Sequence, residues 1–167
     1  MKCLFLTGFM GAGKTSVGHH LGKILSVDVI DTDEWIEQHE KKSIAAIFAE
    51  NGEPYFRQLE TVALKEVAKP NRIVTTGGGI IMEERNRQFM KEQGLVIFLD
   101  CSIEETKKRL QNDTTRPLLK EDKENKIATL YESRLPYYQE AHITVDTTGK
   151  TIEEIALEIV ESIKTFT

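Results

Sequence analysis

Short apolar segments rich in β-branched and aromatic residues recur along the chain, and segments with helical periodicity lie between them. The apolar segments are Cys3–Thr7, Val27–Ile30, Arg72–Thr76, Leu95–Leu99 and Ile143–Val145. Runs of this kind are typical of strands that are buried on both faces of a sheet. Strands that alternate with helices predict a parallel sheet covered by helices on both faces. We therefore expect an α/β protein of three layers with a parallel five-stranded sheet.

Two predicted helices begin with a capping box, in which a hydroxyl residue precedes a glutamate by three positions. These are Ser102 with Glu105, directly after a predicted strand, and Thr151 with Glu154. The apolar stripe that follows the second box consists of Ile152, Ile155, Ala156, Ile159, Val160 and Ile163. The buried stripe of the first predicted helix consists of Val17, Leu21, Ile24 and Leu25. Both stripes have the spacing of a helix that packs one face on a core.

The composition is that of a globular domain. The chain has 167 residues, 40% hydrophobic and 29% charged, and no repeat or linker divides it, so one domain over residues 1–167 is expected. The formal net charge of −5 argues against a nucleic-acid partner, because a phosphate backbone requires a basic face. Cys3 and Cys101 are far apart and form no CxxC, which excludes a disulfide framework and a zinc ribbon.

No apolar run approaches the ~20 residues that a membrane helix needs. The N-terminal segment MKCLFLTGFMGAGKT lacks the apolar core and the cleavage site of a signal peptide. A cytoplasmic protein without a membrane partner is therefore expected. Because the sequence contains no evident coiled-coil pattern, we also expect a monomer.

The segment Gly8–Thr15 reads GFMGAGKT and matches the P-loop pattern G-x-x-x-x-G-K-[ST] between a predicted strand and a predicted helix. Its glycines allow backbone N–H groups to converge on a phosphate, and the helix N-terminus adds partial positive charge. Lys14 is expected to reach the β- and γ-phosphates, and the Thr15 hydroxyl to coordinate Mg²⁺. The P-loop residues expected to bind ATP are Gly11, Ala12, Gly13, Lys14, Thr15 and Ser16.

Two acidic residues, Asp31 and Asp33, follow the second predicted strand and lie two positions apart. We expect both carboxylates to leave the strand end on the same side, in the crevice beside the P-loop. We then expect Asp31 to contact the Mg²⁺ shell and Asp33 to face the acceptor. Capping of the next helix by Asp33 is the alternative. A third acid, Asp100, ends the run LVIFLD like a Walker B strand, but we interpret it as a residue near a helix start.

Three consecutive glycines, Gly77–Gly79, end another predicted strand. Such a run is unfavourable for chain entropy, and close approach of a ligand to the main chain is one reason for it, with a plain turn as the alternative. Arg57, Arg116 and Arg134 stand outside any run of charge. Their guanidinium groups suit a carboxylate or a phosphate, although a solvated salt bridge is the usual role of a single arginine.

The segment 112–125, NDTTRPLLKEDKEN, is polar, carries mixed charge and is interrupted by Pro117. Structureless loops of this length are usually functional, and this one is predicted to be a mobile lid.

The ordered motifs GFMGAGKT, DTD, FRQLE, GGG, RPLL and ESRLP resemble those of the shikimate kinases, a family with a nucleoside-monophosphate-kinase-like P-loop fold. The resemblance extends from about residue 2 to the final helix. It implies transfer of the ATP γ-phosphate to the 3-hydroxyl of shikimate, giving 3-phosphoshikimate and ADP on the route to chorismate and the aromatic amino acids. Mg²⁺ is the implied cofactor.

The resemblance also implies roles for individual residues. Lys14, Asp33 and Arg116 are the implied catalytic residues, with Arg116 reaching the transferred phosphate from the lid. Arg109 matches a position that stacks on adenine, and Asp31 matches a water-mediated contact to Mg²⁺. Met10 is expected to matter only to packing.

An inserted segment at about residues 33–60 is implied to bind much of the shikimate. The residues implied to hold it are Asp33, Arg57, Gly77, Gly78, Gly79 and Arg134. The implied apolar walls are Phe48, Phe56, Pro117 and Leu118. Glu60, one turn after Arg57, is placed to pair with it and orient it.

Two other classes of function remain. One is another small-molecule kinase of the same fold, acting on gluconate or on a nucleotide. The other is a nucleotide-binding regulatory protein without an acceptor, in which the lid is an interaction loop. A metal enzyme based on the 4 histidines is disfavoured, because they show no ligand spacing.

Overall fold

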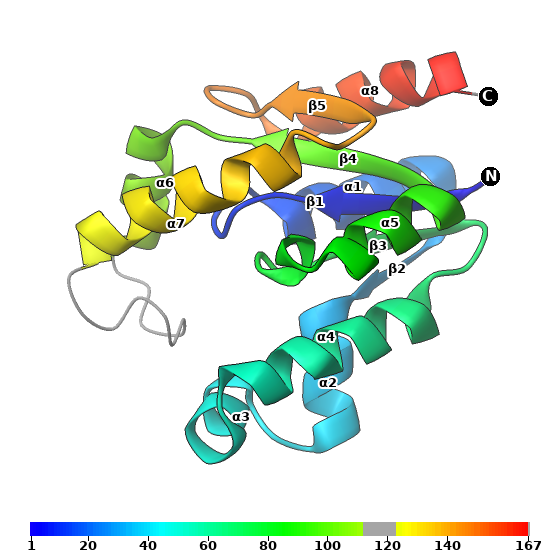
Figure 1. Cartoon of the computed structure of the whole chain (residues 1–167). Helices are drawn as coiled ribbons and strands as arrows, with labels where there is room; N and C mark the ends of the chain where they lie inside the picture. Colours follow the sequence, from blue (N-terminus) through cyan, green and yellow to red (C-terminus); the bar gives the residue numbers. More distant parts are fainter. Residues whose placement is uncertain (112–122, 167) are drawn as a thin grey trace.

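The computed structural model describes residues 1–111 and 123–166 and contains a parallel sheet (Figure 1). Its strands are β1 (Cys3–Thr7), β2 (Asp28–Asp31), β3 (Arg72–Thr75), β4 (Gly94–Asp100) and β5 (Ile143–Asp146). They lie in the order β2-β3-β1-β4-β5, and every neighbouring pair is parallel. Each strand agrees with its predicted segment to within one residue at either end. The predicted α/β class and the five-stranded sheet are confirmed.

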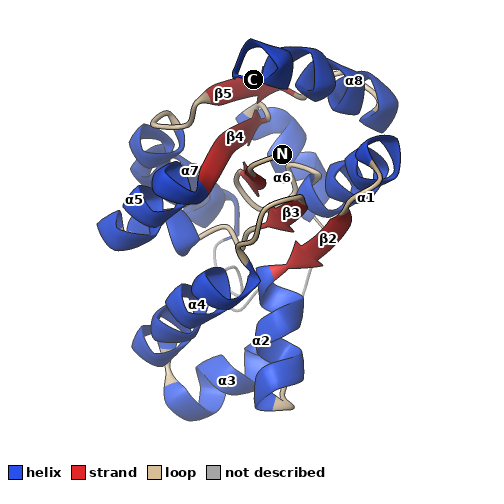
Figure 2. Cartoon of the chain, turned by 90° about the vertical axis from the view of Figure 1, so that its right-hand side faces the viewer, coloured by secondary structure: helices blue, strands red, loops and turns tan. Residues whose placement is uncertain are grey.

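Alternate residues of the strands pack on opposite faces of the sheet. Leu4 and Leu6 of β1 join one apolar cluster with α1 (Lys14–Leu25) and α8 (Ile152–Ile163). Cys3 and Phe5 join a second cluster with α4 (Glu53–Val67) and α5 (Glu84–Gln93). Figure 2 shows α1 and α8 on one side of the strands and α5 on the other. Helices therefore cover both faces, and the three predicted layers are present.

The remaining helices lie toward the carboxyl ends of the strands. The chain leaves β2 directly into α2 (Thr32–Glu40), which is followed by α3 (Ile44–Asn51). These two helices and α4 surround a cluster of their own, and Figure 1 shows them grouped beside the sheet edge at β2. The other elements are α6 (Ile103–Leu110), α7 (Lys123–Tyr138) and the short 3₁₀ turns η1 (Ile80–Met82) and η3 (Lys164–Phe166).

Both predicted helix caps are present. Ser102 Oγ accepts a hydrogen bond from the Glu105 N–H at 3.2 Å, and Thr151 Oγ1 accepts one from the Glu154 N–H at 3.1 Å. The predicted apolar stripes are partly wrong, because Ile24 is 41% exposed and Ile152 is 45% exposed. Each lies at the border of its stripe, where a helix turns its face from the core to the solvent.

The predicted lid lies largely outside the described residues, and so do Arg116, Pro117 and Leu118. The last residues of the predicted segment, 123–125, belong to α7, which begins at Lys123. Within residues 1–111 and 123–166, no helix is both long and apolar enough to span a membrane.

His142 extends the pairing of β4 and β5 with its side chain. The His142 N–H donates to the carbonyl of Val96 at 2.9 Å, and the Val96 N–H donates to His142 Nδ1 at 3.0 Å. Nδ1 accepts only while it carries no proton. Desolvation, followed by the positive charges of Lys91 and Lys2, lowers the pKa of His142. The folded state therefore favours the neutral imidazole.

This contact makes stability depend on pH. Because the pKa of His142 is lower in the folded state, its stabilisation is complete above the unfolded pKa of about 6.5 and is lost as the pH falls further. His142→Asn retains an acceptor that does not titrate. Between pH 7.5 and 5, we expect the free energy of unfolding to fall by about 0.5 kcal/mol more in the wild type than in the variant, a modest effect because the ring is exposed. Urea unfolding at the two pH values measures it, and identical pH dependence would contradict the assignment.

Candidate active site

The P-loop connects β1 to α1 at the carboxyl edge of the sheet. Gly11 and Gly13 have φ angles of 80° and 90°, in the left-handed region that favours glycine. Gly13 is the N-cap of α1, and no side chain caps this helix end. The first N–H groups of α1 therefore have no side-chain acceptor and suit an anion. The Lys14 ammonium folds over the loop and donates to the carbonyls of Gly8 and Phe9 at 2.6 and 3.1 Å.

A cavity of about 250 Å³ lies in front of this loop. We call it the P-loop cavity, and its lining consists of Met10, Gly11, Gly13, Lys14, Thr15, Ser16, Asp31, Asp33, Thr76, Gly77 and Gly78. It brings together most of the predicted phosphate-binding residues. Ala12 is the exception, because its side chain is buried in the apolar cluster behind the loop.

Asp31 and Asp33 reach the site from different secondary structures. Asp31 ends β2 and caps α2, because its Oδ1 accepts from the N–H groups of Asp33 and Glu34 at 2.9 and 3.1 Å. Thr75 Oγ1 donates to its Oδ2 at 2.7 Å. The expectation that both carboxylates extend from a strand end was wrong, and so was capping by Asp33. Helix α2 begins at Thr32, which places Asp33 in its first turn and at the border of both cavities of the site.

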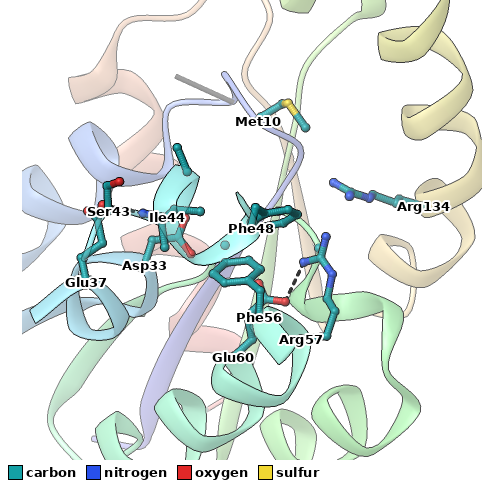
Figure 3. A pocket seen from close by; sticks show the side chains of 14 residues that line it. Met10, Asp33, Glu37, Ser43, Ile44, Phe48, Phe56, Arg57, Glu60 and Arg134 are labelled. Atoms are coloured by element: carbon teal, nitrogen blue, oxygen red, sulfur yellow. Dashed lines mark hydrogen bonds and ion pairs between the residues drawn. The ribbon is translucent and has the colours of Figure 1, made fainter. Parts of the chain in front are cut away.

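The second cavity, of about 550 Å³, lies between α2–α4, the glycine run and α7 (Figure 3). We call it the arginine cavity, because Arg57 of α4 and Arg134 of α7 both point into it (Figure 3). Its lining consists of Met10, Asp33, Glu37, Ser43, Ile44, Ala45, Phe48, Phe56, Arg57, Glu60, Gly77, Gly78, Gly79 and Arg134. All the predicted acceptor-binding residues within the described ranges therefore meet here. Phe48 and Phe56 form one wall, with ring centroids 4.9 Å apart.

The two cavities adjoin. Met10, Asp33, Gly77 and Gly78 line both of them. A phosphate held by the P-loop and a molecule held in the arginine cavity therefore meet at these residues. Asp33 is the ionisable side chain among the four, which places a carboxylate at the junction.

The glycine run is explained by side chains that press against it. A Cβ atom on Gly77 would lie 2.6 Å from Asp33 Oδ1, and one on Gly78 would lie 3.3 Å from Arg134 Nη1. A Cβ atom on Gly79 would lie 2.2 Å from Arg57 Nη1. Each glycine thus leaves room for at least one polar side chain of the site. The structure shows close approach by the protein's own side chains, and the expected approach of a ligand stays a prediction.

Arg57 is held by two carboxylates. Its Nη1 donates to Glu60 Oε1 at 2.6 Å, and its Nη2 and Nε donate to Glu53 Oε1 at 3.2 and 3.4 Å. The predicted pairing of Glu60 with Arg57 is present. Burial raises the pKa of Glu60 to about 7, although the Arg57 charge opposes the rise. The arginine cavity therefore contains a carboxyl group that titrates near neutral pH.

Arg134 projects from α7 and is 2% exposed. Its Cζ lies 5.7 Å from the ring centroid of Phe9, within the range of a cation–π contact with the P-loop. Arg134 forms no ion pair with a carboxylate among residues 1–111 and 125–166, the side chains that the structure describes. Its positive charge is therefore less compensated than that of Arg57.

Arg109 and Asp100 border the P-loop side of the site. The Arg109 guanidinium donates to the carbonyl of Gly11 at 2.8 Å, which places it at the P-loop rim, and its predicted stacking on adenine stays a prediction. Asp100 accepts a hydrogen bond from the Tyr131 hydroxyl at 2.8 Å. Asp100 lines neither cavity, which agrees with our interpretation that it is not a Walker B acid.

Several lining residues were not predicted. Glu37 was not among the predicted site residues. Its Oε2 accepts a hydrogen bond from the Ile44 N–H at 2.9 Å and so links α2 to the start of α3. Ser43 caps α3 through the Ala46 N–H, a signal that the sequence alone contains. Met10 was expected to matter only to packing, yet it lines both cavities. Its place at the junction becomes visible only in the tertiary structure, because residues far apart in the chain line the two cavities.

The fold and the adjoining cavities define a P-loop kinase that acts on a small acceptor. A family model described as shikimate kinase matches residues 10–164. The chain belongs to the shikimate kinase family. A curated shikimate kinase of Bacillus cereus (strain G9842) is 47% identical over 163 residues, which cover 98% of this chain and 99% of the relative. The shikimate kinase of Geobacter metallireducens is 42% identical and covers 95% of this chain and 90% of the relative.

Solved structures agree with this placement. A shikimate kinase from Acinetobacter baumannii in complex with shikimate superposes with a TM-score of 0.96 at 37% identity, covering 100% of this chain and 95% of the other. The shikimate kinase of Aquifex aeolicus gives a TM-score of 0.87 at 37% identity, with 97% and 96% covered. A gluconokinase from Sinorhizobium meliloti, at 16% identity and a TM-score of 0.65, shares the fold alone.

The position of Met10 predicts that it limits access of water to the γ-phosphate. Met10→Ala widens the junction of the cavities, and we expect ATP hydrolysis without an acceptor to rise about fivefold. Met82→Ala is the matched control, because Met82 is 43% exposed and lines neither cavity. ADP release in the absence of an acceptor measures the effect. Equal rates in the two variants would show that Met10 serves packing alone.

Proposed function

We propose that this protein transfers the γ-phosphate of ATP to the 3-hydroxyl of shikimate and releases 3-phosphoshikimate and ADP. The observation that carries the proposal is the arginine cavity, in which two arginines and a glycine backbone face a carboxylate at the edge of the P-loop cavity. Shikimate has one carboxylate and several hydroxyls, and it matches that set of groups. The shikimate complex of the Acinetobacter relative supports the choice.

The arginine cavity suits an acceptor that has a carboxylate at one end and hydroxyls at the other. Arg57 and Arg134 bind the carboxylate, since guanidinium groups match its geometry. Three of the five N–H donors of Arg57 are engaged by Glu53 and Glu60, and the others remain for the acceptor. Asp33 receives the hydroxyl that reacts, and Phe48 and Phe56 contact the apolar face of the ring.

Positioning and charge neutralisation supply the rate, because phosphoryl transfer requires little covalent chemistry from the protein. Lys14 and the N–H groups at the start of α1 stabilise charge on the phosphates. Asp33 orients the acceptor hydroxyl and accepts its proton as the bond to phosphorus forms. Arg116, in the predicted lid outside the described residues, adds positive charge at the transferred phosphate, and Pro117 and Leu118 complete the apolar wall.

The residues of the P-loop cavity fit a Mg²⁺ ion that is carried mainly by phosphate oxygens and water. Thr15 lines this cavity and supplies a hydroxyl. Asp31 already accepts three hydrogen bonds, which fixes its carboxylate and suits a contact through water. Among the residues that the structure describes, no three His, Cys, Asp or Glu side chains form a metal cluster, and Mg²⁺ bound with ATP needs few protein ligands. When bound, the ion neutralises charge that develops on the phosphates.

An acceptor survey tests the proposed function. We expect the purified protein with Mg-ATP to release ADP rapidly with shikimate, and at the background rate with gluconate, with AMP or without an acceptor. Asp33→Asn is expected to lower turnover with shikimate at least about 100-fold while ATP binding persists, because the junction loses its proton acceptor. Stimulation by gluconate or AMP would assign a different acceptor. ATP binding without stimulation by any acceptor would favour a regulatory protein.

The glycine run gives a second test. Gly79→Ala places a Cβ atom on the Arg57 guanidinium, which must move, and we expect KM for shikimate to rise about tenfold or more. KM for ATP is expected to stay unchanged. Gly149→Ala is the control, because no atom lies within 4 Å of its added Cβ, although its φ of 72° makes the variant less stable. Steady-state kinetics with both substrates distinguishes the two variants. An unchanged KM for shikimate in Gly79→Ala would remove Arg57 from the acceptor site.

A further inference from the structure

Tyr138 is a buried tyrosine in the last turn of α7 that lines neither cavity. It is 1% exposed, and its ring stacks on Phe98 of β4 with centroids 4.9 Å apart and an interplanar angle of 6°. The stack fixes the ring plane and therefore the direction of the hydroxyl. A buried phenol requires hydrogen-bond partners, and those of Tyr138 are groups of the site.

The Tyr138 hydroxyl lies between two parts of the arginine cavity. It donates a hydrogen bond to the carbonyl of Gly78. Burial raises the pKa of Tyr138 to about 12, so the phenol is neutral near pH 7. The positive charge of the nearby Arg134 guanidinium opposes this rise. Arg134 Nη1 and Tyr138 Oη lie 3.3 and 3.8 Å from the point where Gly78 would carry a Cβ atom. The three groups therefore meet at Gly78.

The chemistry of these groups sets the direction of both contacts. A carbonyl only accepts and a guanidinium only donates, so the hydroxyl directs its proton to Gly78 and leaves its lone pairs for the nearby Arg134. A phenol can perform both roles at once and remain neutral. It orients Arg134 without removing the positive charge that a carboxylate would compensate.

The two arginines of the cavity differ in this respect. Glu53 and Glu60 hold Arg57. Arg134 lies over the Phe9 ring and beside the Tyr138 hydroxyl, and its buried Nε has no hydrogen-bond partner among the described residues. The Tyr138 hydroxyl is therefore a polar group of the protein that can orient Arg134 where no carboxylate of the described residues does so.

We propose that Tyr138 is a positioning residue for acceptor binding, which aligns the Arg134 guanidinium with the Gly78 backbone through one neutral hydroxyl. This inference rests on the proposed function, in which Arg134 binds the carboxylate of shikimate. Tyr138 itself does not contact the acceptor. Its effect is therefore on the affinity for shikimate and not on the chemical step.

Tyr138→Phe tests the proposal, because the stack on Phe98 is retained and only the hydroxyl is lost. We expect KM for shikimate to rise about tenfold, which corresponds to ~1.4 kcal/mol, while kcat and KM for ATP change less than about twofold. Tyr131→Phe is the matched control, since it removes another hydroxyl of α7, one that is bound to Asp100. Its KM for shikimate is expected to match the wild type. An equal rise in the two variants, or none in Tyr138→Phe, would overturn the proposal.

A double-mutant cycle with Arg134→Lys identifies the residue through which Tyr138 acts. We expect the KM of the double variant to rise by clearly less than the product of the two single effects. A full product would overturn the proposed link to Arg134. If Arg134→Lys alone leaves KM for shikimate unchanged, the proposed role of Arg134 has failed. If Arg134→Lys raises KM and Tyr138→Phe does not, the role of Arg134 stands and the inference about Tyr138 has failed.

Discussion

The close approach of polar side chains to the backbone that follows β3 is the constraint on which the site depends. Asp33 comes from α2, Arg57 from α4 and Arg134 from α7, and each has an atom within 3.3 Å of the point where a larger residue in the glycine run would place its Cβ atom. The run therefore acts as a common surface for three separate helices. Without it, the carboxylate at the junction and the two guanidinium groups would stand farther apart. The sites for the acceptor and the phosphate adjoin because side chains of α2, α4 and α7 all pack against the backbone that follows β3.

Charge is distributed unevenly over this surface, and the distribution fits an anionic acceptor. Glu53 and Glu60 compensate Arg57, and burial of Glu60 raises its pKa to about 7. Arg134 contacts an aromatic ring and a neutral phenol instead. The cavity thus retains positive charge at the side that faces α7, which favours a carboxylate. A site in which every arginine had a carboxylate partner would attract such an acceptor less strongly.

Local patterns predicted the fold closely because the strands are short, apolar and regularly separated by helices. The five strand positions and the caps at Ser102 and Thr151 follow from neighbouring residues alone. The errors fall where tertiary contacts decide. Ile24 and Ile152 are apolar yet exposed, and the sequence does not state where the core ends. Asp31 takes the helix cap that was considered for Asp33, because α2 begins one residue after β2 ends.

The sequence by itself determined the chemistry of the protein: a phosphate-binding loop, acids beside it, glycines and arginines for an anionic acceptor, and the family that contains them in this order. These signals depend on residue type and local spacing, which can be read without a three-dimensional structure. Tertiary structure alone decided which groups touch. It placed Met10 at the junction of two cavities and the Tyr138 hydroxyl beside both Gly78 and Arg134. Those contacts join residues far apart in the chain, and only the packing of helices against a sheet brings them within reach.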